Sequence, residues 1–86
     1  MIIAAASVES VPSDPLPDWV LTYRREIGDR IRAERERQKV TQEGLAELAD
    51  LDRKTVNRIE QGAYSTLIDH LIRIARALGV PLRDLV

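Results

Sequence analysis

Residues 42–61 decide the fold, with the sequence QEGLAELADLDRKTVNRIEQ. Thr41 stands directly before them, and threonine is a residue type that caps helix N-termini. Asp52 lies in the middle of the stretch as a second capping residue, and Gly62 follows it, as glycine often does just past a helix C-terminus. The pattern predicts two short helices joined by a tight turn. We expect helices over residues 42–49 and 53–61, with the turn at 50–52.

The apolar positions of this stretch predict an inner face. Ala46 and Ala49 are small enough to let two helices cross closely. The inner positions expected on the first helix are Leu45, Ala46, Leu48 and Ala49, and Leu51, Val56 and Ile59 fill the core below. With these residues turned inward, the polar residues of helix 53–61 point outward.

Further helices are expected on both sides. Asp18 is a capping candidate for a helix over residues 18–38, whose apolar stripe recurs every fourth residue at Trp19, Tyr23, Ile27 and Ile31. Gly28 lies inside this helix at a cost of about 1 kcal/mol. Thr66 and Asp69 suggest a capping pair for helix 67–78, which Gly79 ends, and Pro81 opens a last helical turn over 81–85. The sequence predicts an all-α fold, a compact bundle of about five helices.

The bulk composition limits the function. The chain has 86 residues, the length of one domain, and a net charge of −1. All 13 lysines and arginines lie at or after Arg24. From residue 22 onward the chain has 13 basic and 11 acidic residues, a net charge of +2. There is no cysteine and a single histidine, His70, so we expect no metal and no cofactor. With no nucleophile–base pair and no glycine-rich phosphate loop, an enzyme is not expected.

The first residues differ in composition from the rest. Pro12, Pro15 and Pro17 disfavour a helix, so residues 1–17 are expected to form a disordered tail and residues 18–86 the folded domain. The opening MIIAAA is too short for a signal sequence and lacks a basic flank. No stretch approaches the length of a membrane span, so we expect a cytoplasmic protein, associated with the nucleoid in a prokaryote.

Residues 27–86 resemble the Cro-repressor type of helix-turn-helix domain, the XRE family. The motifs that carry the resemblance are Ile27 and Ile31, Thr41-Gln42-Glu43-x-Leu45-Ala46, Val56-x-Arg58-Ile59-Glu60-x-Gly62, and Ile74-Ala75-x-Ala77-Leu78-Gly79-Val80. The chain departs from the family where Asp50 replaces the usual glycine of the turn and where Lys39 and Thr66 replace a frequent glycine and proline. Aspartate tolerates the left-handed conformation, so we expect the turn to survive.

The resemblance implies a lambda repressor-like DNA-binding domain in which helix 53–61 enters the major groove. Arg53 and Lys54 are expected to donate to guanine, and Asn57 to bridge N6 and N7 of adenine. Arg58 is expected to contact phosphate, and Thr55 a thymine methyl group or a phosphate. The family places Gln42 on a phosphate, bracing a side chain of the recognition helix, and Tyr64 and Ser65 along the DNA backbone. It also implies a salt bridge between Arg35 and Glu60. The alternative for each polar residue is a solvated surface position.

Relatives bind DNA as two-fold dimers, so we expect double-stranded DNA and a second copy of the chain as partners. The function expected is that of a sequence-specific transcription regulator, a dimeric repressor that reads a palindromic operator. The surplus apolar residues expected at the dimer interface are Leu67, Ile72, Leu82, Leu85 and Val86. The alternative is that Trp19 and the start of helix 18–38 cover these residues within one chain. Trp19 is expected to be a packing anchor for the first turns of that helix. The alternatives are an antitoxin, a restriction-modification controller, or a protein-interaction module that binds a partner protein through residues 1–21.

Overall fold

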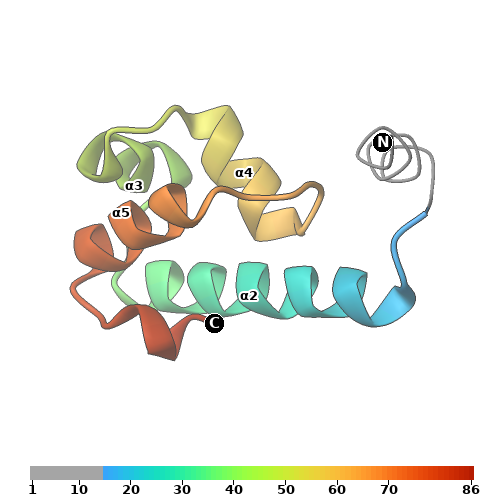
Figure 1. Ribbon diagram of the computed structural model, residues 1–86. Coiled ribbons are helices and arrows are strands. Elements are labelled where there is room, and N and C mark those ends of the chain that lie inside the picture. Colours follow the sequence, from blue (N-terminus) through green and yellow to red (C-terminus); the bar gives the residue numbers. More distant parts are fainter. Residues whose placement is uncertain (1–14) are drawn as a thin grey trace, which may run out of the picture.

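The computed structural model describes residues 15–86, so the predictions for residues 1–14 lie outside the described part of the chain. The elements of this part are α2 (Asp18–Arg37), α3 (Gln42–Ala49), α4 (Arg53–Gln61), α5 (Ile68–Leu78) and the 3-10 turn η1 (Leu82–Asp84). Residues 15–86 contain no strand, and the prediction of an all-α fold is confirmed. Figure 1 shows α2 running along one side, with α3, α4 and α5 packed above its C-terminal part and η1 below it.

The number of helices differs from the prediction. Residues 15–86 form four α-helices instead of five, because the segment after Pro81 closes only as a 3-10 turn. The N–H of Asp84 bonds the carbonyl of Pro81, and the N–H of Leu85 bonds that of Leu82, so both hydrogen bonds span three residues. This short turn still brings Leu85 into the core, where its side chain is buried.

Side-chain caps fix the start of two helices. The hydroxyl of Thr41 accepts from the N–H of Gly44 at 2.9 Å, and the carboxylate of Asp52 accepts from the N–H of Thr55 at 2.7 Å, as predicted. Asp18 and Thr66 are not caps, contrary to the prediction. The capping positions of α2 and α5 are Pro17 and Leu67, neither of which makes a side-chain bond, and Asp18 lies within the first turn.

Left-handed residues end the helices. Gly62 and Gly79 follow α4 and α5 with φ of 65° and 72°, as their positions in the sequence predict. Asp50 ends α3 with φ 59° and ψ 46°, so the turn survives without glycine. Lys39 also adopts φ 59° after α2, where L-residues are disfavoured. The two turns therefore carry backbone strain that glycine would not have.

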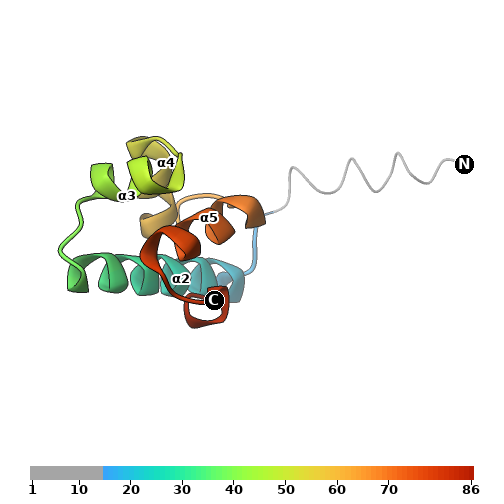
Figure 2. The same ribbon diagram turned by 90° about the vertical axis from the view of Figure 1, so that its left-hand side faces the viewer.

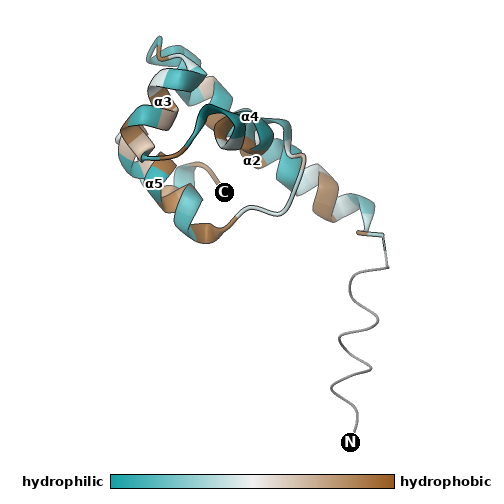
Figure 3. Cartoon of the chain, turned by 90° about the horizontal axis from the view of Figure 1, so that it is seen from above, coloured by the Kyte–Doolittle hydropathy of each residue, from teal (hydrophilic) through white to brown (hydrophobic). Residues whose placement is uncertain are grey.

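The core joins all four helices and η1. Its buried apolar members are Ile31, Leu45, Ala46, Ala49, Val56, Ile59, Leu71, Ile74, Ala75, Leu78 and Leu85. Leu48 is 65% exposed, so its predicted inward orientation is wrong. At 100° per residue, Leu48 lies about 100° from the middle of the face that Leu45, Ala46 and Ala49 bury. The hydropathy colouring in Figure 3 shows apolar and polar residues alternating along the helices.

Gly28 permits the contact between α2 and α4. A Cβ atom at this position would lie 2.3 Å from the carbonyl oxygen of Glu60 and 2.6 Å from that of Ile59. These distances are far below van der Waals contact, and both obstacles are backbone atoms, so only glycine fits. Gly28 lowers the helix propensity of α2, but the close packing of α2 on α4 requires it.

The N-terminal turns of α2 project beyond the rest of the bundle (Figure 1). Ile31 is fully buried and Ile27 half-buried, but Tyr23 is 57% exposed and Trp19 is 65% exposed. The prediction that Trp19 is a packing anchor is therefore wrong, since α4 and α5 cover only the later part of the apolar stripe. Among the described residues, no helix is long and apolar enough to cross a membrane.

Candidate nucleic-acid interface

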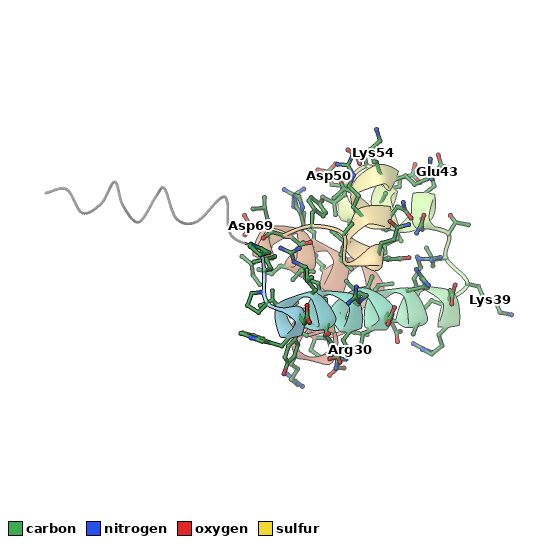
Figure 4. The ribbon with its side chains drawn as sticks, turned by 90° about the vertical axis from the view of Figure 1, so that its right-hand side faces the viewer. Arg30, Lys39, Glu43, Asp50, Lys54 and Asp69 are labelled. Atoms are coloured by element: carbon green, nitrogen blue, oxygen red, sulfur yellow. The ribbon has the colours of Figure 1, made fainter. Side chains whose placement is uncertain are left out.

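The outer face of α4 is polar and accessible. Val56, Ile59 and Glu60 turn inward and are buried. The exposed side chains of this helix are Arg53, Lys54, Arg58 and Gln61, and Thr55 and Asn57 are half-buried on its two flanks. Figure 4 shows Lys54 pointing away from the bundle, at the end opposite Arg30 of α2. A major groove is wide enough to admit an α-helix, and this face offers it several hydrogen-bond donors.

Gln61 is absent from the set of residues that the sequence suggested. It lies seven residues after Lys54 and three after Arg58, so the three side chains follow one line along the outer face. Its position next to Gly62 identified it only as the end of the helix. Helical spacing from Lys54 would have identified it as part of the same surface.

Gln42 lies at the start of α3 and contacts α4. Its side-chain nitrogen donates to Oε1 of Glu60 at 3.0 Å and to Oδ1 of Asn57 at 3.2 Å. Gln42 is half-buried, so both bonds are partly shielded from water. The contact holds the first turn of α3 against the middle of α4 and joins the two helices of the motif through side chains as well as through the turn.

Arg35 and Glu60 form an ion pair between α2 and α4. The pair is bidentate: Nε of Arg35 donates to Oε2 of Glu60 at 2.7 Å, and Nη2 donates to Oε1 of Glu60 at 3.0 Å. The remaining guanidinium nitrogen, Nη1, donates to the backbone carbonyl of Val40 at 2.9 Å. The hydrogen bonds from Arg35 to Glu60 raise the pKa of Arg35 above its ordinary value, so the guanidinium stays charged. Glu60 is only 1% exposed, and the pair joins α2, α4 and the connection to α3.

The loop between α4 and α5 carries Tyr64 and Ser65. Ser65 is exposed and Tyr64 is half-buried against the core. The guanidinium carbon of Arg58 lies 5.9 Å from the centre of the Tyr64 ring, within the range of a cation–π contact. The contact places a positive charge beside the tyrosine, so Arg58 and Tyr64 form one patch at the C-terminal end of α4.

Acidic groups surround the N-terminal end of α4. Glu43 and Asp50 lie at the same end of the molecule as Lys54 (Figure 4). Asp52 accepts the N–H of Thr55, and this bond lowers the pKa of its carboxyl group. Arg73 of α5 donates to the carbonyl of Asp50 at 3.1 Å. The exposed face of α4 therefore carries both acidic and basic side chains and is not uniformly basic. The near-neutral composition of the chain predicts such a mixture.

The overall arrangement is a helix-turn-helix. Figure 2 shows α3 and α4 together at one end of the molecule, above α5 and α2, and α4 also packs directly against α2 at Gly28. The sequence profile of the helix-turn-helix family matches residues 31–85, from the middle of α2 to the end of η1. Because this match covers more than half of the chain, the chain belongs to the helix-turn-helix family.

Individual relatives agree with this assignment. The chain is 38% identical over 60 residues to the immunity repressor protein of Bacillus phage phi105, which covers 70% of the chain. The matched region spans 42% of the length of that repressor.

Two solved structures share the fold. One is the restriction-modification controller protein C.AhdI from Aeromonas hydrophila, with 32% identity and a TM-score of 0.70, covering 72% of this chain and 94% of that one. The other is the hypothetical transcription factor NHTF from Neisseria, with 29% identity and a TM-score of 0.72, covering 84% and 82% of the two chains. These likenesses confirm the resemblance to lambda repressor-like regulators.

Proposed function

We propose that the chain is a sequence-specific DNA-binding transcription regulator that acts as a repressor, with α4 lying in the major groove. The observation that carries the proposal is the exposed polar line of Lys54, Arg58 and Gln61 on the second helix of a helix-turn-helix. Arg53 flanks this line at the N-terminal end, where such helices meet base edges. The relatives named as a repressor and a controller support the regulatory role.

The proposed contacts fall into two classes. Arg53, Lys54 and Asn57 read bases, because they lie on the outer and α3-facing sides of α4. Thr55 contacts a thymine methyl group or a phosphate. Phosphate contacts are proposed for the N-terminus of α3 at Gln42, and for the patch of Arg58, Tyr64 and Ser65 at the other end of α4. Phosphate contacts position the helix and base contacts choose the sequence, so the two classes have separable effects on binding.

The test begins with an unbiased selection of DNA sequences that the wild-type protein binds. Binding to the selected site is then measured by fluorescence anisotropy at several salt concentrations. We expect Lys54→Ala to weaken binding to the selected site by about tenfold and to relax the preference at the base pair that Lys54 reads, because one base contact is lost. Arg53→Ala relaxes the preference at one base pair.

Arg30→Ala is the matched control. It removes the same charge from an exposed site on α2 that faces away from Lys54 (Figure 4). We expect this variant to bind within about twofold of the wild type, since screened charges at that distance contribute little. If Arg30→Ala and Lys54→Ala weaken binding equally, or if the selection enriches no sequence, the proposed interface is wrong.

We further propose that the regulator is a dimer. A single α4 reads few base pairs, and two-fold regulators place their helices roughly 34 Å apart on successive major grooves. Leu67, which precedes α5, and Ile68 and Ile72 of α5 are all at least half exposed and form an apolar patch that a second copy would bury. Leu85 is buried in the core of the same chain and is not free to form the interface, contrary to the sequence-based expectation, whereas Leu82 is half-buried and Val86 is 50% exposed. Sedimentation equilibrium tests the dimer, and Ile72→Asp is expected to dissociate it.

A partner protein is the second candidate, because an exposed apolar surface lies outside the family match. Leu16, just before α2, and Trp19 and Tyr23 in its first turns are exposed, and all three precede residue 31. This surface is the proposed binding element if the chain is an antitoxin or a partner-binding regulator. A pull-down with the full chain, compared with the Trp19→Ser/Tyr23→Ser variant, distinguishes the two functions. Capture that is the same for both proteins would refute this second candidate.

A further inference from the structure

A cavity of about 210 Å³ lies between the first half of α2, the end of α4 and the loop that leads to α5. Its lining residues are Arg24, Ile27, Ile59, Gly62, Tyr64, Ser65, Thr66 and Leu71. The end of α4 approaches α2 closely here, since a Cβ atom on Gly62 would lie 2.8 Å from the backbone nitrogen of Arg25. Figure 1 shows the loop after α4 on the same side of α2 as α4 itself. The cavity is therefore built by three helices and a connecting loop.

The polar side chains of the cavity are Arg24, Tyr64, Ser65 and Thr66. None of them takes part in the side-chain hydrogen bonds and ion pairs that form among residues 15–86. No residue three or four positions from Arg24 in α2 is acidic, so its own helix offers this half-buried guanidinium no carboxylate. Thr66 does not cap α5, although its position in the sequence suggests a cap. One guanidinium and three hydroxyl groups are thus available to a ligand.

The lining favours a small organic anion. It contains one cationic side chain and no carboxylate, and Arg58 brings a second guanidinium to 5.9 Å from the ring of Tyr64. A guanidinium pairs with a carboxylate through two parallel hydrogen bonds. The three aliphatic side chains of the lining suit a hydrocarbon group, and a cavity of about 150 Å³ is already large enough for benzene. The volume of about 210 Å³ therefore suits a carboxylate that carries one aromatic ring or a branched chain.

We propose that this cavity binds a small aromatic or branched-chain carboxylate, and that the bound anion weakens DNA binding. The second part rests on the proposed function. Tyr64 and Ser65 line the cavity and are also the proposed donors to the DNA backbone. A bound carboxylate competes for their hydroxyl groups and adds a negative charge beside the phosphate that they would contact. Because coupling between two sites is reciprocal, DNA weakens carboxylate binding by the same factor.

The site is tested first without DNA, by following the backbone amide NMR signals of the full chain during titration with benzoate. We expect saturable shifts at residues 24–27 and 62–66, with a dissociation constant of about 1 mM, a reasonable affinity for a ligand of about nine non-hydrogen atoms. Benzamide keeps the ring without the charge, and acetate keeps the charge without the ring. Each is expected to bind at least about tenfold more weakly than benzoate.

Arg24→Met removes the guanidinium and keeps most of the aliphatic stem, so we expect benzoate to bind at least about tenfold more weakly. Arg25→Met is the matched control, because Arg25 is exposed on the same helix and does not line the cavity. It is expected to bind benzoate within about twofold of the wild type. Urea unfolding curves establish that both variants fold. Equal losses in the two variants, no saturation up to about 10 mM, or tighter binding of benzamide, acetate or inorganic phosphate than of benzoate would overturn the site.

The effect on DNA is measured by fluorescence anisotropy with the selected site. We expect saturating benzoate to weaken DNA binding by about fivefold, the lower end of typical coupling, and an equal concentration of sodium chloride to have no comparable effect. Arg24→Met is expected to lose this response. Benzoate that binds without weakening DNA binding, or that weakens it equally in Arg24→Met, would refute the coupling. If the selection enriches no sequence, the proposed function fails, and the titration without DNA still decides whether the cavity binds a carboxylate.

Discussion

The effect of Gly28→Ala on stability has opposite signs in an isolated helix and in this fold. In an isolated helix, alanine stabilises by about 1 kcal/mol relative to glycine. In this fold, the new Cβ would lie 2.3 Å from the carbonyl oxygen of Glu60 and 2.6 Å from that of Ile59. Normal contact begins at about 3.5 Å, so α4 must move away from α2 by about 1 Å. Both neighbours are backbone atoms, so no side-chain rotation relieves the overlap.

The size of the effect follows from the packing that is lost. Overpacking of a well-packed core costs about 1–3 kcal/mol. The displacement also stretches the bonds of the Arg35–Glu60 pair, so we expect the upper end of this range, about 3 kcal/mol. After the gain of about 1 kcal/mol in helix propensity, the net loss is about 2 kcal/mol. For a domain of this size, the melting temperature falls by at least about 8 °C. Urea and thermal unfolding, followed by circular dichroism, measure both quantities.

Gly44→Ala is the matched control, since it makes the same exchange inside another helix. Its Cβ would lie 3.2 Å from Oγ1 of Thr41 and from Cγ1 of Val40, both side-chain atoms that can shift slightly. We expect a change within about 1 kcal/mol in either direction. If Gly28→Ala stabilises the protein as much as Gly44→Ala does, then the close approach of α2 and α4 is not a feature of the fold.

Other parts of the fold give smaller, separable effects. Thr41→Ala removes the cap of α3 and is expected to lower the free energy of unfolding by about 1 kcal/mol, whereas Thr41→Ser preserves it; urea titration measures both. Lys39→Gly relieves a left-handed φ and is expected to stabilise by up to about 1 kcal/mol, so a lower melting temperature would contradict the strain at this position. The lowered pKa of Asp52 means that its charge stabilises the fold fully above the ordinary value of about 4 and that this contribution is lost as pH falls through the lower folded value. The stability difference between wild type and Asp52→Asn should therefore shrink as acid is added. Arg35→Leu leaves the buried Glu60 without its bidentate partner, with only the exposed Arg32 at 3.7 Å, and is expected to cost about 3 kcal/mol, most of which Arg35→Leu/Glu60→Leu recovers.

The helix ends that the sequence predicts correctly have local causes. Thr41 and Asp52 bond an N–H three residues ahead, and Gly62 and Gly79 adopt a backbone conformation that their residue type favours. Such signals need no knowledge of the rest of the fold. Thr66 fails because it lies one residue too early, since the capping position of α5 is occupied by Leu67.

Properties that depend on two elements could not be predicted in this way. Gly28 has the appearance of a weak point in a helix until the backbone of α4 is known to lie against it. Trp19 and Tyr23 continue an apolar stripe, but nothing in the stripe shows where the neighbouring helices end. The proposed DNA contacts divide likewise. Helical spacing predicts which residues share the outer face of α4, but the hydrogen bond from Gln42 to Asn57 depends on how α3 and α4 pack together.

The buried Glu60 connects stability with recognition. Removing its charge from water is costly, and a pair of apolar residues would fill the same space at no such cost. An apolar side chain at position 60 would nevertheless offer Gln42 no acceptor, and without that acceptor Gln42 would be free to turn either end of its amide toward Asn57. It follows that Arg35→Leu/Glu60→Leu should fold stably and yet bind the selected DNA more weakly than the wild type, because Gln42 is no longer held against α4 through Glu60. The ion pair is therefore needed to hold Gln42 at the start of α3 against α4, and only secondarily for the stability of the fold.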